Sequence, residues 1–277
     1  MWAGLELWAR GSGRELVCLD DESRPQLAVR VSEQLVELGC DPVLGPYGSD
    51  TTRAVARARA GRVVWNHGAA ADDVQRLPGV VSVASPASRY LAALARAAAG
   101  LGAKRVALVT APGAFAAFAR RGLEREVDVL EIELVGVPAD ADCVLLCGPV
   151  EWEEKRFREL DGRGLLLGGV SPGLPNAPRA WPDGTLAPVQ WHPELGGPSG
   201  LEDYVAAQAY AAALIAERCL ALDPADPLSA ARELAVDTFF GAFRLDETGL
   251  QTGHRLSVVR WLRGRQTLLP AFQPDSR

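Results

Sequence analysis

With 277 residues, 48% of them hydrophobic, the chain can bury the core of one large domain or of two modest ones. Its net charge is −6, and its 29 basic residues are scattered rather than clustered. This distribution argues against a surface that follows the phosphates of a nucleic acid.

Short apolar runs alternate with helical patterns through the first two thirds of the chain. In chain order, the patterns predict strands and helices at these positions: strand 16–19, helix 25–38, strand 42–44, helix 51–60, strand 63–65, helix 72–77, strand 80–84, helix 88–101, strand 105–110, helix 114–125, strand 127–134, strand 143–146, helix 152–160 and strand 165–167. Such alternation is typical of an α/β fold with parallel sheets joined by crossover helices.

The pattern changes after residue 168. A stretch rich in Pro and Gly, residues 172–198, is predicted to be mostly loop, and a long helix follows at 201–222. Residues 239–269 are predicted to form strands. Earlier in the chain, only about seven residues join the strands that end at 134 and begin near 142. A parallel crossover needs roughly a dozen, so these strands are either antiparallel or lack their helix.

Neither a membrane span nor a secretion signal is indicated. The longest apolar stretch, residues 205–222, is interrupted by Gln208, Glu217 and Arg218, as expected of a soluble amphipathic helix. The first fifteen residues show no basic segment followed by an apolar run and a small-residue cleavage site. As written, the chain would be cytoplasmic.

One motif resembles a catalytic motif but lacks a group that the catalytic chemistry needs. Residues 169–173 match the G-x-S-x-G elbow of hydrolases and follow a predicted strand. The oxyanion hole of such an enzyme uses the N–H group of the residue after the serine, and here that residue is Pro172, which has none. The sequence therefore predicts no catalytic residues.

Metal sites and disulfides are not expected either. Cys143 and Cys147 have no second Cys/His pair at zinc spacing. His67, His192 and His254 are far apart in the sequence, so no metal and no cofactor is predicted. The cysteines, five in number, lie in apolar surroundings and are predicted to be buried free thiols.

Two strand ends carry the positive signal for a binding site. Residues 45–52, Gly-Pro-Tyr-Gly-Ser-Asp-Thr-Thr, lie between a predicted strand and a helix, and so do residues 66–72, Asn-His-Gly-Ala-Ala-Ala-Asp. Backbone N–H groups at a helix N-terminus favour an anionic group, and the Ser49 and Thr51 hydroxyls add donors. Ordinary helix capping by Ser49 or Asp50 is the alternative explanation for one loop alone. Because ligands bind beyond the carboxyl ends of parallel strands, two such loops favour a site for a carboxylate.

Several segments in order resemble a known family. The segments "GPYGSDTTRAVARA", "VVWNHGAAADDV", "SPASRYLAALARAAAGLGAKRVALVTAPGAFAAFARRGLE" and "DTFFGAFRLDETGLQTGHRLSVVRW" are similar to the branched-chain amino-acid and amide-binding family of ABC-transporter solute-binding proteins. The resemblance covers residues 4–262. It implies the type I periplasmic-binding fold, in which two α/β lobes with parallel sheets flanked by helices enclose a ligand in the cleft between them.

The resemblance also implies which residues bind the ligand. Ser49 falls on the hydroxyl that contacts the ligand carboxylate in relatives, and Asp50 and Thr51 follow it in the same loop. Asn66, His67, Gly68, Ala69 and Ala70 fall on a loop usually written Ser-Pro-x-Ala-Thr, so Ala70 replaces a hydroxyl residue. In the second lobe, Phe115 falls near an aromatic residue that packs on the ligand. Trp191, in the loop that returns to the first lobe, is a further candidate wall. Asp50 and Glu194 are candidate partners for an ammonium group.

The implied lobes are discontinuous in sequence. The first comprises residues 1–85 and 190–250, and the second comprises residues 86–189 and 251–277. The family also begins with an apolar strand, central to the first sheet, ahead of the helix that here starts near Trp2. The chain as written lacks that strand and any signal peptide, and the short 135–141 link suggests a reduced second lobe.

The leading hypothesis is non-catalytic binding of a small polar molecule, such as an amino acid, amide or carboxylate, with hinge closure around it. In a transporter, the partner of the closed form is an ABC permease, and the family is extracytoplasmic. The alternative is a cytoplasmic ligand-sensing regulator on the same fold, whose partner is a regulatory protein. Neither hypothesis involves nucleic acid or direct membrane insertion.

Overall fold

The computed structural model describes residues 1–59, 61–175 and 181–269, and the chain divides into two compact units. Unit 1 comprises Met1–Pro86 and Leu195–Arg255, and unit 2 comprises Ala87–Glu194 and Leu256–Arg277. Compared with the division expected from the sequence, residues 190–194 lie in unit 2, whereas residues 251–255 and Pro86 lie in unit 1. The second difference follows from hydrogen bonds that join Gln251 to Val83 and His254 to Ser85.

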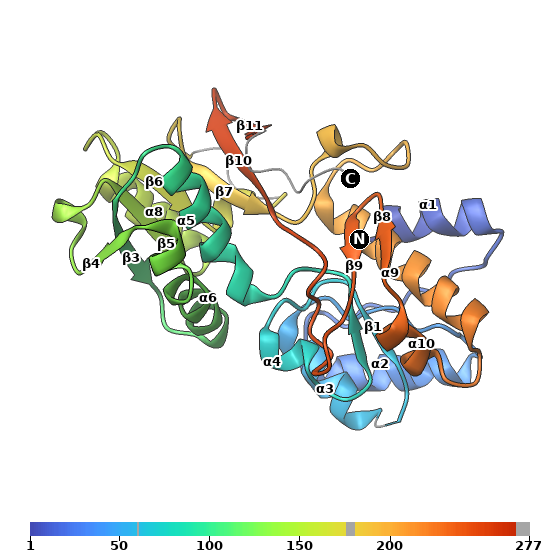
Figure 1. Ribbon diagram of the computed structural model, residues 1–277. Coiled ribbons are helices and arrows are strands. Elements are labelled where there is room, and N and C mark those ends of the chain that lie inside the picture. The colour runs from blue at the N-terminus through green and yellow to red at the C-terminus, as the bar shows by residue number, and fades with distance from the viewer. Residues whose placement is uncertain (60, 176–180, 270–277) are drawn as a thin grey trace. The chain divides into compact units, whose positions relative to one another are not determined.

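Unit 2 is built on a seven-stranded sheet in the order β11-β10-β7-β6-β5-β3-β4 (Figure 1). The strands from β7 to β4 are parallel, whereas β10 is antiparallel to both β7 and β11. The strands are β3 (Arg105–Thr110), β4 (Glu133–Val135), β5 (Cys143–Cys147), β6 (Leu166–Gly169), β7 (Leu186–Val189), β10 (Ser257–Leu262) and β11 (Arg265–Leu268).

Helices cover both faces of this sheet. They are α5 (Tyr90–Gly100), α6 (Ala114–Glu124), α7 (Val127–Leu130) and α8 (Val150–Leu160), with 3-10 turns at η1 (Ala87–Arg89), η2 (Pro138–Asp140), η3 (Ser171–Gly173) and η4 (Pro193–Leu195). Alternation along β5 separates two cores, because successive side chains point to opposite faces. Leu145 packs with Leu91 of α5, whereas Leu146 packs with Phe157 of α8.

Unit 1 has a smaller sheet. Strands β1 (Val64–Asn66) and β2 (Val80–Ser82) are parallel, and a single bridge joins Leu44 to Trp65 on the other side of β1. A separate antiparallel pair is formed by β8 (Val236–Thr238) and β9 (Gly241–Phe243). The helices are α1 (Trp2–Ser12), α2 (Pro25–Glu37), α3 (Ser49–Ala58), α4 (Asp72–Gln75), α9 (Tyr204–Leu222) and α10 (Pro227–Glu233).

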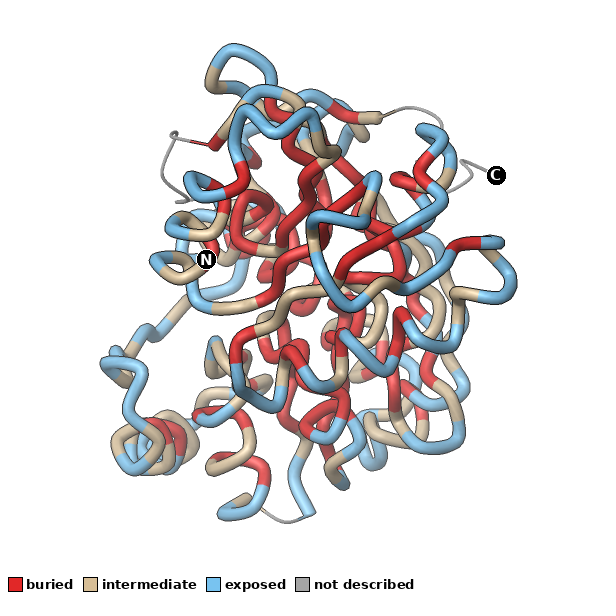
Figure 2. The backbone as a smooth tube through the Cα atoms, turned by 90° about the vertical axis from the view of Figure 1, so that its left-hand side faces the viewer, coloured by how far each residue is buried: buried red, intermediate tan, exposed pale blue. Residues whose placement is uncertain are grey.

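Two hydrophobic clusters lie in the described part of unit 1. Val64 and Val80 of the sheet pack with Ala28 of α2 and Val55 of α3. The other cluster joins Trp8 of α1 to α9. Buried residues are concentrated on the strands and on the helix faces that contact them (Figure 2).

Helix α9 has the length and composition of a membrane span, the one such helix found in the described residues. Of its most apolar window, 56% is buried inside the molecule. Ala213 of α9 is fully buried against Trp8 and Ala9 of α1. The helix therefore serves as a core helix of unit 1.

The α/β prediction is confirmed, but several predicted elements are wrong in detail. Residues 16–19 form no strand, and residues 127–130 form a helical turn ahead of β4. The predicted loop at 172–198 contains β7. Both β4 and β5 pair in parallel with β3, so the short link between them crosses β3 with only the 3-10 turn η2. The end of the predicted helix 51–60, Ala60, and residues 176–180 of the predicted loop lie outside the described residues.

Candidate ligand-binding site

The first candidate loop leads into the N-terminus of α3. Thr51 and Thr52 are buried, and their hydroxyls donate to backbone carbonyls of this loop: Thr51 Oγ1 to Tyr47 and Gly48 at 3.2 and 3.0 Å, and Thr52 Oγ1 to Pro46 at 3.1 Å. The Thr51 hydroxyl, predicted to donate to the ligand, therefore donates within the loop.

Ser49 joins the two candidate loops. Its Oγ accepts a hydrogen bond of 3.3 Å from the Ala71 N–H group, which ends the second loop. Since this bond uses a lone pair, the Ser49 hydroxyl proton is left to donate elsewhere. The predicted proximity of the two loops is thus present within unit 1. Asp50, next in the helix, is exposed.

Asn66 organises the second loop from inside the protein. It is fully buried, and its Oδ1 accepts from the Gly68 and Ala69 N–H groups at 3.1 and 2.7 Å. Its Nδ2 donates to the Ala69 carbonyl at 2.8 Å and to Ser82 Oγ at 2.6 Å. The Asn66 side chain therefore positions the loop and has no polar capacity left for a ligand.

These contacts change which backbone groups of the second loop are available. The prediction placed the backbone of Gly68, Ala69 and Ala70 on the ligand. Gly68 and Ala69 already donate to Asn66, so within the described contacts only the Ala70 N–H group remains to donate. Gly68 is required for a close approach, because a Cβ there would lie 2.2 Å from the Tyr47 ring.

His67 is a packing residue of this loop. Its side chain is 1% exposed, its Nε2 lies 2.6 Å from Met1 Sδ, and its ring lies 5.8 Å from the Tyr47 ring. Among the described residues, His67 Nδ1 has no hydrogen-bond partner. Burial, and secondarily the positive charge of the α-amino group, lowers the pKa of His67 to about 4. The ring is therefore neutral at pH 7.

The lowered pKa of His67 predicts a loss of stability in acid. In the unfolded chain the His67 ring takes up a proton near pH 6.5, whereas in the folded protein it takes up that proton only near pH 4. Stability is therefore complete above pH 6.5 and falls through this window, by about 3 kcal/mol in total. Denaturant titrations between pH 4 and 7 measure this loss, and His67→Gln should reduce it. An unchanged pH slope in that variant would assign the loss to other groups.

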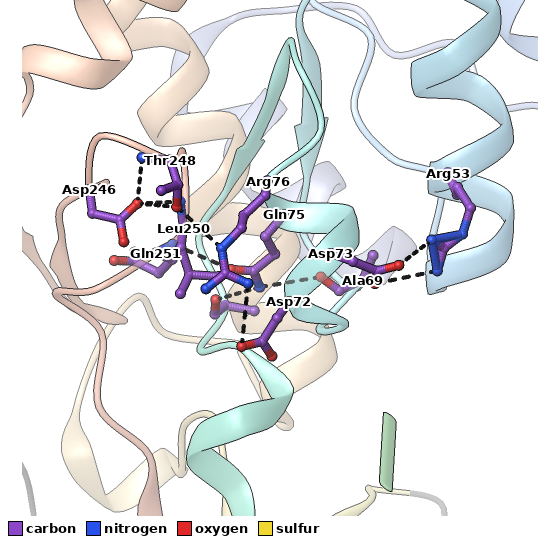
Figure 3. A network of polar contacts seen from close by, with 11 residues as sticks. Arg53, Ala69, Asp72, Asp73, Gln75, Arg76, Asp246, Thr248, Leu250 and Gln251 are labelled. Atoms are coloured by element: carbon purple, nitrogen blue, oxygen red, sulfur yellow. Dashed lines mark hydrogen bonds and ion pairs between the residues drawn. The ribbon is translucent and has the colours of Figure 1, made fainter. Parts of the chain in front are cut away.

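A network of polar contacts joins the second loop, residues 66–72, to other segments of unit 1 (Figure 3). Gln75 is fully buried; its Nε2 donates to the Ala84 carbonyl at 3.1 Å and lies 3.4 Å from the Ala69 carbonyl, while its Oε1 accepts from the Gln251 N–H group at 3.4 Å. On the surface of the same network, Arg53 pairs with Asp73 at 2.6 Å. Residues far apart in the sequence thus hold the loop in place.

Unit 2 has its own group of aromatic and polar side chains near the start of α6. Phe115 is half-buried and packs edge-on against Tyr90, with ring centroids 5.2 Å apart. Gln190 Nε2 donates to the Tyr90 hydroxyl at 2.6 Å. Trp191 follows Gln190 after β7 and is buried. The sequence prediction named Phe115 and Trp191 but missed Tyr90, which has no distinguishing motif around it.

A buried carboxyl group bridges two loops of unit 2. Glu153 Oε1 accepts from the Gly148 N–H group at 2.8 Å, and its Oε2 accepts from the Ser171 N–H group at 2.9 Å. Burial raises the pKa of Glu153 to about 8, against the opposing effect of these N–H donors. Glu153 thus binds the G-x-S-x-G segment through its backbone, and the Ser171 hydroxyl interacts with both the Gly148 carbonyl, at 3.3 Å, and the Glu153 carboxyl.

The described residues contain no group of three or more His, Cys, Asp or Glu side chains that could hold a metal ion. All five cysteines are free. Cys143, Cys147 and Cys219 are buried, as predicted, and burial raises the pKa of each to about 12. Cys18 is exposed, which corrects the prediction, because residues 16–19 are not covered by a neighbouring strand.

Comparisons with known proteins are consistent with this geometry. Residues 9–142 match the family described as "Periplasmic binding protein". Comparison of the sequence with curated proteins gave no significant match.

Several solved structures have the same fold. An ABC-transporter substrate-binding protein from Desulfitobacterium hafniense in complex with Leu has a TM-score of 0.80 and 19% identity, over 97% of this chain and 95% of that one. A solute-binding protein from R. palustris in complex with 4-hydroxybenzoate has a TM-score of 0.75 and 17% identity, over 96% and 89% of the two chains. A leucine-binding protein from Thermotoga maritima has a TM-score of 0.75 and 16% identity, over 97% and 92%.

These matches extend over nearly the whole chain, and the family match covers the segment that holds both candidate loops. The chain therefore has the type I periplasmic-binding fold, and the predicted resemblance to periplasmic binding proteins is present over residues 9–142.

Proposed function

We propose that the protein is a non-catalytic solute-binding protein whose ligand carries a carboxylate, held by the two loops of unit 1. The observation that carries the proposal is the state of Ser49. Its oxygen accepts from Ala71, so its proton is directed to an acceptor outside that bond. A carboxylate oxygen is the acceptor that this position favours.

Backbone donors surround the Ser49 hydroxyl. As the first residues of α3, Ser49, Asp50 and Thr51 have N–H groups without intrahelical acceptors. The partial positive charge of the helix N-terminus adds to their attraction for an anion. The Ala70 N–H group contributes a donor from the second loop. Together these groups form a small set of hydrogen-bond donors, which suits a carboxylate.

The class of ligand is inferred from the matched proteins. The solved relatives are described with Leu and with 4-hydroxybenzoate, two molecules that share a carboxylate and differ in the rest. In unit 2, Phe115 and Tyr90 offer an aromatic surface and Gln190 offers a polar contact. We propose that the ligand is a small carboxylic acid of this kind.

The expected effect of Ser49→Ala is a loss of ligand affinity of about 10- to 100-fold, since a hydrogen bond to a charged group contributes about 1.5–3 kcal/mol. A thermal-shift screen of amino acids and aromatic acids identifies the ligand, and calorimetry then measures both proteins. Ser12→Ala removes the same atom from α1, at a site away from both loops, and should leave affinity unchanged.

The proposed recognition of a carboxylate is tested by comparing the affinities for the acid and for the amide of the same ligand. Wild-type protein should bind the acid more tightly than its primary amide, and Ser49→Ala should narrow that difference. If no acid or amide raises the melting temperature, or if Ser49→Ala binds as tightly as wild type, the proposal fails.

The partner follows from the same proposal. The matched structures are ABC-transporter binding proteins, which favours a transport role over a ligand-sensing regulator. We propose that the ligand-bound form is recognised by an ABC permease outside the cytoplasm. Cell fractionation followed by detection of the native protein tests this location.

A further inference from the structure

The short edge strand of unit 2 leaves part of its neighbour uncovered. Strand β4 lies at the end of the seven-stranded sheet (Figure 1) and pairs with β3 only from Arg105 to Ala107. On its other side, β3 pairs with β5 as far as Thr110. The link from β4 to β5 contains only the 3-10 turn η2. In the described part of the chain, the last three residues of β3 therefore have a strand on one side only.

The uncovered end of β3 directs a backbone donor away from β5. The Ala111 N–H group donates to the Cys147 carbonyl of β5. Successive residues of a strand direct their N–H groups to opposite edges, so the Thr110 N–H group points to the edge that β4 does not reach. The Thr110 hydroxyl accepts a hydrogen bond of 3.1 Å from Arg120 Nη2. Among the described contacts, the proton of that hydroxyl remains available to an acceptor.

This end of β3 lines a cavity of about 680 Å³. That volume lies within the range of about 300–1,000 Å³ that is usual for small-molecule sites. Leu108, Val109 and Leu146 of the sheet line the cavity, together with Leu160 of α8 and residues 136–139 of the link. Most of these side chains are apolar, so this part of the lining suits the hydrocarbon or aromatic part of a ligand.

Three arginines supply the charged part of the lining. Arg120 comes from α6, Arg156 from α8 and Arg163 from the turn after α8. Helices α6 and α8 pack on opposite faces of the sheet. Side chains from both layers line one cavity because the edge of the sheet is open at this point.

The negative charges nearby do not balance these arginines. Arg156 Nη1 donates to Glu159 Oε2 at 2.6 Å, and Glu159 is the one acid among the described residues that line the cavity. Arg120 lies 4.0 Å from Glu124 in an exposed pair, which contributes little. Arg163 forms no ion pair within the described part of the chain. Three arginines and one glutamate give the lining an excess of two positive charges, in a chain whose net charge is −6.

One donor of these arginines is unpaired. Arg156 Nε is buried and has no hydrogen-bond partner among the described residues. Its guanidinium carbon lies 5.5 Å from the centroid of the Trp152 ring. A buried donor without an acceptor is unfavourable. A conformation in which an anion pairs with this guanidinium therefore gains a hydrogen bond that the free protein lacks.

We propose that this cavity binds a small dianion with an apolar body, at a site that shares no residue with the two loops of unit 1. The guanidinium groups of Arg120, Arg156 and Arg163 hold the negative charges, because their paired N–H donors match the oxygens of a carboxylate or phosphate. The hydroxyl and N–H group of Thr110 add two donors, and the apolar side chains contact the rest of the molecule. A phosphate monoester and a dicarboxylate share this chemistry.

Binding of phenyl phosphate to the full chain tests the site. At about pH 8, where a phosphate monoester carries close to two negative charges, calorimetry should show saturable binding. Benzyl alcohol keeps the ring without the charge, and inorganic phosphate keeps the charge without the ring. Each should bind at least about tenfold more weakly. Phthalate carries two carboxylates on the same ring, and its affinity relative to phenyl phosphate distinguishes the two kinds of dianion.

A matched pair of substitutions in α6 locates the site. Arg120→Gln removes a cation from the lining and should weaken phenyl phosphate binding about tenfold or more. Arg125→Gln removes the same charge at the end of the same helix, where the residue does not line the cavity, and should bind nearly as wild type does. Both residues are exposed, so both variants should keep the wild-type Tm without ligand. Ser49→Ala should also bind phenyl phosphate normally, which separates this site from the proposed carboxylate site.

Hydrogen exchange places the bound ligand. Phenyl phosphate should slow exchange at Thr110 and in the link 136–139, and should leave residues 66–72 unchanged. The proposal is overturned if phenyl phosphate and phthalate do not bind saturably, or if benzyl alcohol or inorganic phosphate binds equally well. It is also overturned if Arg120→Gln and Arg125→Gln bind alike, if Ser49→Ala abolishes binding, or if exchange at Thr110 and in the link does not change.

Discussion

Replacing Asn66 by alanine is expected to lower the free energy of unfolding of unit 1 by about 3–5 kcal/mol. The side chain is fully buried and forms four hydrogen bonds, to Gly68, Ala69 and Ser82. Alanine leaves two N–H groups, a carbonyl and a hydroxyl without this partner, and each buried group left unpaired costs about 1–3 kcal/mol. Water that enters the vacated space can pair with these groups, so the total loss of stability lies at the low end of the summed cost of four lost hydrogen bonds.

Denaturant titration followed by hydrogen exchange of residues 64–82 measures this loss where it occurs. Ser82→Ala is the matched control, since it removes one of the four bonds and is expected to cost about 1–2 kcal/mol. Asn66→Asp retains the oxygen that accepts from Gly68 and Ala69 but places a charge in a buried position. Equal losses in Asn66→Ala and Ser82→Ala would show that the two backbone N–H bonds contribute little.

The second large effect expected is a loss of stability in unit 2 as pH rises from about 4.5 to 8. The pKa of Glu153 is raised to about 8 in the folded state, so the folded protein holds a proton that the unfolded chain releases near pH 4.5. The stabilisation is therefore complete below pH 4.5 and is lost as pH rises through 8. The pKa difference corresponds to about 4–5 kcal/mol as an upper estimate.

Glu153→Gln tests the origin of that slope. The amide keeps the shape and an oxygen for the Gly148 or Ser171 N–H group, but it does not titrate. Urea titrations from pH 5 to 8, with hydrogen exchange of β5 and β6 as the local probe, should show a flatter profile in the variant. If the two backbone N–H donors outweigh burial, the wild-type carboxyl ionises normally and its profile is already flat.

Local sequence signals predicted that two candidate loops lie ahead of helices, but not the contacts of every residue in them. Loops 45–52 and 66–72 lie between a strand or extended segment and a helix, and Ser49 bonds to the second loop. Thr51 was predicted to contact the ligand because its hydroxyl is a donor, and Asn66 because it falls on a loop that holds the ligand in the family that the chain resembles. Their hydrogen bonds are instead made within unit 1, to atoms that no sequence pattern assigns to them.

Strand pairing explains why the strand predicted at residues 16–19 does not form. Residues 16–19 have strong strand propensity, but a strand exists only when a neighbour supplies hydrogen bonds, and propensity contains no information about that neighbour. The same limit applies to the network around Gln75, whose partner Gln251 lies 176 residues away. Glu153 was missed because a single glutamate in a charged helix carries no sign of its burial.

The discontinuity of unit 1 has a consequence for synthesis of the chain. The Trp8 indole N–H group donates to Glu217 Oε2, a partner 209 residues later in the sequence. At about 5–20 residues per second, a ribosome adds that partner on the order of 10–40 s after Trp8. Until then the apolar face of α1 lacks α9, so the nascent chain presents this helix to chaperones for most of the time that the protein takes to be made.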